Sequence, residues 1–184
     1  KTAPGSGKSK LAEMVSIIVT GLPSVMLTWT ENPEEQRKLL TSVCASGAPV
    51  ACFDNVKGSF GGAELEQLLT SSVYGARKLG GNDLFALPNL TTWLATGNNA
   101  QLTADMTRRV VVARIVPKVE NPEDRPLKDF RYPDLLGHVR SVRGELVSAA
   151  LTIVRAYILA GRPAVDAQPW GSHTGWQTMV LRAL

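Results

Sequence analysis

Cysteine and histidine are scarce in this sequence. Its 184 residues include two of each, too few for a disulfide scaffold or a cysteine-rich zinc site. Long apolar runs are also missing, since the longest comparable stretch, residues 146–160, is interrupted by Ser148, Thr152 and Arg155. A membrane-spanning helix needs about 18 or more apolar residues in a row. We therefore expect a reduced, cytoplasmic protein with no membrane partner.

The remaining composition is that of a globular protein. Hydrophobic residues make up 44% of the chain and charged residues 20%, a balance that excludes a disordered chain. The net charge is +4, and the excess lies in residues 107–143, which hold nine basic and five acidic side chains. Such a block suits an anionic partner, either a nucleotide phosphate or a nucleic acid backbone. The alternative is an ordinary solvated surface, because runs of this size are common.

Segments with helical and strand-like patterns alternate along most of the chain. This alternation predicts an α/β fold with a parallel sheet covered by helices on both faces. Residues 1–130 would form the core, and residues 131–184 a C-terminal helical segment. Helices are expected over 8–20, 33–46, around 65–69, over 143–160 and around Trp176; strands over 24–30, 49–56, 91–96 and 109–116; a β-hairpin over 73–87; and an irregular arm over 117–133.

A glycine-rich loop leads directly into the first predicted helix. In Gly5-Ser6-Gly7-Lys8-Ser9, the glycines would let backbone N–H groups surround phosphate oxygens at a helix N-terminus. The Lys8 ammonium could reach the outer phosphates of ATP, and the Ser9 hydroxyl could bind Mg²⁺. The complete pattern has a further glycine where this chain has Thr2, so a chance Gly-Lys-Ser in a loop is the alternative.

An acidic residue ends the second predicted strand. Asp54 follows an almost continuous apolar run, as expected for a carboxylate that serves a nucleotide-bound Mg²⁺. ATP hydrolases of this kind place a second acid next to it, but here the neighbour is Asn55, which cannot accept a proton. Another carboxylate would have to act, or hydrolysis is slow; the candidates are Glu31, Glu64 and Asp83. Alternatively, Asp54 only caps a turn.

Polar residues also follow the later strands. Asn98 and Asn99 end the strand over 91–96, where a side-chain amide could orient water, although Gly-Asn-Asn is also a common turn. Arg108 and Arg109 come next and could stabilise a phosphoryl group in a neighbouring subunit. Ligands of open α/β sheets bind at the carboxyl ends of the strands. The order of these groups therefore favours a nucleotide site.

The runs GSGKS, PVACFDNV and LPNLTTWLATGNNAQLTADMTRRVVVARI resemble AAA+ or superfamily 3 helicase-type ATPases of phage and mobile-element replication proteins, which are often fused to a primase. The stretches FRYPDLLGHVRSVRGELVSAALTIVRAYILAGRP and WGSHTGW are similar to the helical segment that follows this core. The resemblance implies a P-loop NTPase (AAA+-like) fold whose first strand precedes Lys1, a homo-oligomeric ring, commonly a hexamer, and DNA in its channel. It further implies that Lys8 and Ser9 are the lysine and hydroxyl of the Walker A motif and that Asp54 is the Walker B acid. Asn98 or Asn99 would be the polar sensor residue, and Arg108 or Arg109 the arginine finger. The hairpin that carries Arg77 and Lys78 would face the channel.

Three functions remain open at this point. The first is an ATP-driven DNA helicase-like motor or remodeller in phage or mobile-element DNA replication, with Mg²⁺ and ATP bound between subunits. The second is a nucleotide-gated initiator or loader that binds ATP and DNA without appreciable hydrolysis, as Asn55 suggests. The third, a small-molecule P-loop kinase, is disfavoured because the chain has an arginine pair suited to a neighbouring subunit and no evident lid for an acceptor.

Overall fold

A computed structural model describes residues 5–77, 84–117, 119, 121–165 and 171–184. Its central feature is a sheet of three parallel strands in the order β1-β2-β6. The members are β1 (Val25–Leu27), β2 (Val50–Val56) and β6 (Thr92–Gly97). Parallel pairing requires crossover connections, and helices supply them here.

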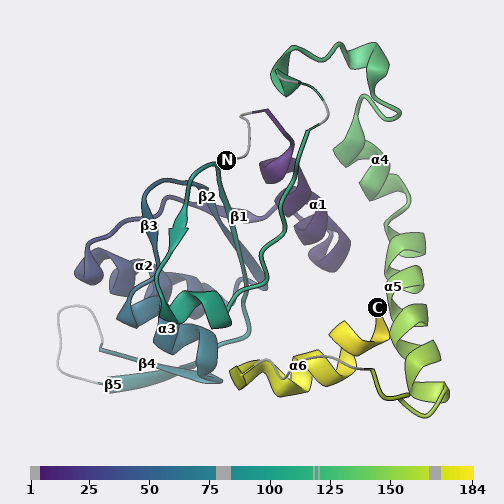
Figure 1. Ribbon diagram of the computed structural model, residues 1–184. Helices are drawn as coiled ribbons and strands as arrows, with labels where there is room; N and C mark the ends of the chain where they lie inside the picture. The colour runs from purple at the N-terminus through teal and green to yellow at the C-terminus, as the bar shows by residue number, and fades with distance from the viewer. Residues whose placement is uncertain (1–4, 78–83, 118, 120, 166–170) are drawn as a thin grey trace.

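Helices flank this sheet, so the predicted α/β fold with a parallel sheet is confirmed. In Figure 1, α1 (Lys8–Thr20) lies on one side of the strands, and α2 (Pro33–Ser46) and α3 (Ala63–Thr70) lie on the other. The ends of α2 follow from the sequence: Asn32 accepts N–H bonds from Glu34 and Glu35, and Gly47 closes the helix in a left-handed conformation.

The core is built around the buried strand β2. Phe53 is fully buried and lies between three other aromatic rings: Trp29, Phe60 and Trp93, with ring centroids 5.1, 5.8 and 5.7 Å away. Ala51, on the same face of the strand, packs against Val43 of α2. Because Phe53 is held in a close-packed core, the carboxyl end of β2, which follows it, has a fixed position.

Smaller strands lie at the periphery. β3 (Ser59–Phe60) pairs in parallel with β7 (Gln101–Leu102), and β4 (Val73–Arg77) pairs with β5 (Leu84–Pro88) as an antiparallel hairpin. The predicted hairpin is thus confirmed. Residues 78–83 between its arms, which include Lys78, lie outside the described residues.

The C-terminal part is helical, as predicted. It contains α4 (Leu135–Ser141), which was not predicted, α5 (Arg143–Leu159) and α6 (Thr174–Met179), and Figure 1 shows α4 and α5 beyond α1. Arg143 joins the two parts by donating to the Ile17 and Val19 carbonyls at the end of α1. No helix in the described ranges has the length and apolarity to cross a bilayer. The short 3₁₀ turns are η1 (Asp105–Arg108), η2 (Pro122–Asp124), η3 (Leu127–Asp129), η4 (Gly171–His173) and η5 (Leu181–Ala183).

The predicted strand over 109–116 is wrong. Arg109 caps the short turn η1, and residues 110–117 form no regular element. Val111, Val112 and Val116 are 65%, 59% and 82% exposed. β-Branched composition favours a strand only where a neighbouring strand supplies hydrogen bonds and packing, and none of the described strands pairs with this segment.

We expect the stability of this core to fall at alkaline pH, partly through Tyr74. Burial raises the pKa of Tyr74 to about 12, helped by the Glu64 charge; the ordinary value is near 10. Between these values the unfolded chain loses its proton first, so the free energy of unfolding falls as pH rises, by at most about 1.4 kcal/mol per pH unit. In urea unfolding from pH 8 to 11, the free energy of unfolding of Tyr74→Phe should fall less steeply with pH than that of the wild type. Equal slopes for the two proteins above pH 10 would contradict this prediction.

Candidate functional site

The glycine-rich loop has the backbone conformation that its sequence predicts. Gly5 and Gly7 have φ values of 67° and 87°, in the left-handed region that favours glycine. Gly7 immediately precedes α1 and provides no side-chain cap, and the N–H groups of the first turn of a helix are the groups that bind anions. Lys8 Nζ donates to Ser6 Oγ at 2.7 Å. The Lys8 ammonium therefore lies beside the loop, at the N-terminus of α1.

Glu123, from the segment over 107–143, lies against this loop. A Cβ atom on Gly5 would come within 2.8 Å of Glu123 Cβ and 2.9 Å of its backbone nitrogen. The turn η2 thus packs directly on Gly5, and no larger residue fits there.

The central contact joins the loop to strand β2. Ser9 Oγ donates a 2.6 Å hydrogen bond to Asp54 Oδ1, across 45 positions of sequence. Hydrogen bonds from Ser9 and then Thr96 hold the pKa of Asp54 below its ordinary value, against the opposing effect of burial. Asp54 is therefore ionised at neutral pH, next to a hydroxyl that can share a cation with it.

Thr96 is the site residue that sequence reasoning missed. It belongs to β6, is 8% exposed, and donates to Asp54 Oδ1 at 2.6 Å. The sequence feature that could have indicated Thr96 is its hydroxyl near the carboxyl end of a predicted strand. Threonine is also common in strands for packing reasons alone, so this signal does not by itself indicate a site residue.

Asn55 occupies a special backbone position. Its φ is 54°, one of two positive values at non-glycine residues in the described structure. Asparagine tolerates this left-handed conformation better than most residues, glutamate included. The asparagine in place of the expected acid therefore has a conformational reason.

Asn55 and Asn98 line the same hollow at the carboxyl ends of β2 and β6. The hollow has a volume of about 330 Å³, and its lining also includes Val56, Lys57, Gly58 and Asn99. Asn98 Oδ1 is buried and accepts no hydrogen bond within the described part of the chain. An unsatisfied buried carbonyl oxygen is costly, and Asn98 Oδ1 can accept a hydrogen bond from water or from a ligand.

The candidate carboxylates lie in different places. Glu31 accepts a hydrogen bond from the Ser59 N–H, and its Oε1 lies 3.0 Å from the Cβ position of Gly58, at the hollow. Glu64 instead accepts from the Tyr74 hydroxyl, and Asp83 lies outside the described residues. Of the two described candidates, Glu31 is therefore the one whose carboxylate lies next to a residue that lines the hollow, Gly58.

The structure distinguishes the two arginines but joins neither to the loop. Arg108 is 66% exposed and pairs with Asp105 at 2.6 Å. Arg109 is partly buried and donates to the Glu66 carbonyl of α3 at 3.3 Å. Arg108 can leave its neighbour at little cost, because exposed ion pairs contribute about 0–1 kcal/mol, whereas Arg109 secures α3. Arg77 is the last residue of β4, and its predicted role stays a prediction.

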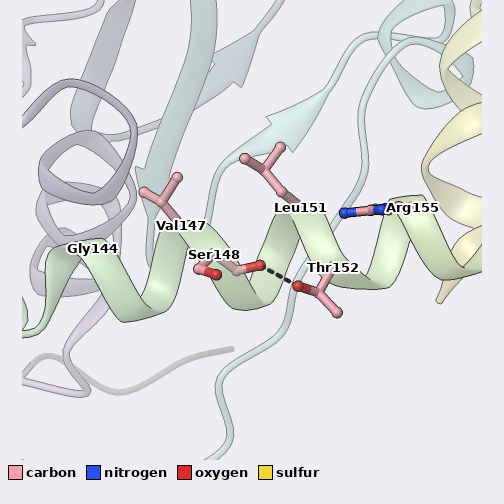
Figure 2. A pocket seen from close by; sticks show the side chains of 6 residues that line it. All are labelled: Gly144, Val147, Ser148, Leu151, Thr152 and Arg155. Atoms are coloured by element: carbon pink, nitrogen blue, oxygen red, sulfur yellow. Dashed lines mark hydrogen bonds between the residues drawn. The ribbon is translucent and has the colours of Figure 1, made fainter.

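A second hollow runs along α5 and differs in character. It has a volume of about 370 Å³, and Figure 2 shows that its lining comes from this single helix. The hydrogen bond drawn there, from Thr152 Oγ1 to the Ser148 carbonyl at 2.7 Å, is internal to the helix. This hollow brings no separate elements together and suggests no chemistry.

The residues at the loop suit Mg²⁺ better than a transition metal. No group of three or more His, Cys, Asp and Glu side chains that could hold a metal occurs among the described residues. Mg²⁺ needs only one or two protein ligands, because phosphate oxygens and water complete its shell. Ser9 and Asp54 fit that requirement. Comparisons with protein families, with curated proteins and with solved structures found no match to this chain.

Proposed function

We propose that the chain is a P-loop ATPase of the AAA+ or superfamily 3 helicase type, which drives a DNA helicase-like motor or remodeller in phage or mobile-element replication. The observation that carries the proposal is the hydrogen bond between Ser9 Oγ and Asp54 Oδ1. It joins the hydroxyl after a phosphate-binding loop to the acid at the end of a buried parallel strand. This is the pair that a Mg²⁺-nucleotide requires.

Each group has a defined task in this proposal. The N–H groups at the start of α1 bind phosphate oxygens, and Lys8 neutralises their charge. Ser9 and Asp54 would hold Mg²⁺, which supplies charge stabilisation for phosphoryl transfer when bound. Asn98 would accept a hydrogen bond from the attacking water through its buried Oδ1. Since Asn55 cannot remove the proton, Glu31, whose carboxylate lies beside Gly58, is the candidate base.

The DNA and ring parts of the proposal rest on the resemblance and on charge. Residues 107–143 carry the excess of basic side chains, and Arg77 ends one arm of the hairpin. In a homo-oligomeric ring, commonly a hexamer, Arg108 would reach the nucleotide of the neighbouring subunit. Its exposure of 66% suits that role.

A second candidate function is a nucleotide-gated initiator or loader that binds ATP and DNA but hydrolyses ATP scarcely or not at all. One observation favours it: Asn55 lies in a left-handed conformation where the acid of a hydrolase is expected. A glutamate there would carry a backbone strain of about 1–2 kcal/mol.

The experiment that separates the two is steady-state ATP hydrolysis, with and without single-stranded DNA. We expect DNA to stimulate hydrolysis and Arg108→Ala to lower the stimulated rate by about 10³-fold, since an arginine supplied in trans contributes about that much. Arg109→Ala serves as the matched comparison, because its expected effect is loss of thermal stability through α3. ATP binding without turnover would favour the initiator or loader. If Arg109→Ala were inactive while Arg108→Ala hydrolysed ATP as the wild type does, Arg108 would not be the arginine that acts on the neighbouring nucleotide.

A further inference from the structure

We infer that Thr96 is a positioning residue of the nucleotide site: its hydroxyl clamps the carboxyl end of β2, so that Asp54 faces Ser9 and Asn55 faces the hollow. The inference rests on the proposed function, because it assigns Thr96 a role in binding Mg²⁺-ATP. It goes beyond that proposal in naming a residue outside the loop and the acidic strand end.

The first observation is an irregularity in the ladder between β2 and β6. Phe53 pairs with Ala95 and Val56 pairs with Gly97, so two residues of β2, Asp54 and Asn55, face the single residue Thr96. This is the geometry of a β-bulge, which turns side chains away from their regular alternation and removes backbone groups from the ladder. The bulge includes Asp54, the residue proposed to bind Mg²⁺.

The second observation is how the Thr96 hydroxyl compensates for the bulge. Its oxygen accepts the Asn55 N–H at 2.9 Å, a group that has left the regular pairing. Its proton is donated to Asp54 Oδ1 at 2.6 Å. One hydroxyl thus uses both its donor and an acceptor position, and it connects the acid, the amide and the neighbouring strand.

The third observation is that Asp54 Oδ1 receives hydrogen bonds from two sides. Ser9 approaches from the loop and Thr96 from β6, each at 2.6 Å. Two donors on one oxygen restrict rotation of the carboxylate. Groups that orient a metal ligand in this way typically change metal affinity by about 10- to 100-fold when removed. A loss of the Thr96 hydroxyl should therefore affect Mg²⁺-dependent binding specifically.

The test uses Thr96→Val, which keeps the shape and the β-branch but lacks the hydroxyl. Thr96→Ser restores the hydroxyl, and Thr92→Val is the matched control at the exposed opposite end of β6. ATP affinity is measured by calorimetry with Mg²⁺ and with EDTA, and hydrogen exchange of the Asn55 amide is followed by NMR. If Thr96→Val fails to fold, Thr96→Ala replaces it.

We expect Thr96→Val to reduce the gain in ATP affinity due to Mg²⁺ by about 10- to 100-fold, with unchanged affinity in EDTA and faster exchange at Asn55. Thr96→Ser and Thr92→Val should resemble the wild type. An unchanged Mg²⁺ gain in Thr96→Val, or equal losses with Mg²⁺ and with EDTA, would overturn the inference while the proposed function stands. A wild type that binds no ATP would overturn the proposed function and the inference together.

Discussion

Lys8→Ala is expected to weaken ATP binding about 10- to 100-fold, both with Mg²⁺ and in EDTA. A hydrogen bond to a charged group is worth about 1.5–3 kcal/mol, and each 1.4 kcal/mol changes affinity tenfold. The effect should not depend on Mg²⁺, because Lys8 acts on the phosphates directly. In the structure its ammonium lies at the loop, 2.7 Å from Ser6 Oγ. Calorimetric titration with ATP measures the change.

The matched control is Lys10→Ala. Lys10 lies on the same helix, is 60% exposed and pairs with Glu13. Removing it changes the net charge equally but leaves the loop intact, so ATP affinity should stay at the wild-type value. Equal losses in the two variants would mean that general charge, not the loop, attracts the nucleotide.

Asp54→Asn is expected to remove most of the gain in ATP affinity that Mg²⁺ provides, about 10- to 100-fold, while binding in EDTA is retained or improved. The amide keeps an oxygen that can accept from Ser9 or Thr96, but it lacks the charge that attracts the cation. Because hydrogen bonds from Ser9 and Thr96 lower the Asp54 pKa, the wild-type carboxylate is already charged at neutral pH. Parallel titrations with Mg²⁺ and with EDTA measure the loss.

Asp129→Asn provides the comparison for this variant. Asp129 is exposed, ends the short turn η3 and has no predicted part in the site. It should bind Mg²⁺-ATP as the wild type does. An Asp54→Asn protein that keeps the full Mg²⁺ gain would show that Asp54 only caps the end of β2.

The parts of the fold that could be predicted are those encoded by local patterns. The capping sequence Asn32-Pro33 and the closing Gly47 defined α2, and the apolar run over 49–53 that precedes Asp54 indicated the buried strand β2. The packing of α1 against β2 then places the predicted Ser9 and Asp54 in contact. Local sequence and the alternation of helices and strands were sufficient to predict α2, β2 and the parallel sheet.

The parts that could not be predicted depend on contacts between distant segments. Residues 110–117 have the composition of a strand, but a strand requires a partner, which composition does not reveal. The environments of Arg108 and Arg109 differ because Arg109 donates to the Glu66 carbonyl of α3, a contact between distant segments that the adjacent positions of the two arginines do not reveal. Thr96 became significant through a one-residue irregularity in the β2–β6 ladder, and register is a property of two strands together.

Asn55 shows that a departure from an expected motif can have a backbone cause. The sequence alone suggested a lost acid. The structure adds that this position has a φ of 54°, which asparagine accepts readily and a glutamate does not. Replacing Asn55 by glutamate is therefore a poor way to test for hydrolysis, because strain and chemistry would change together.

Titration of the wild-type chain with ATP, in Mg²⁺ and in EDTA, tests the central claim most directly, because the Lys8→Ala and Asp54→Asn variants are both judged against it. The contact between Ser9 and Asp54 predicts one ATP bound per chain, with an affinity that Mg²⁺ raises. Binding that is absent, or that is the same in Mg²⁺ and in EDTA, would contradict the claim that Ser9 and Asp54 form a Mg²⁺-nucleotide site.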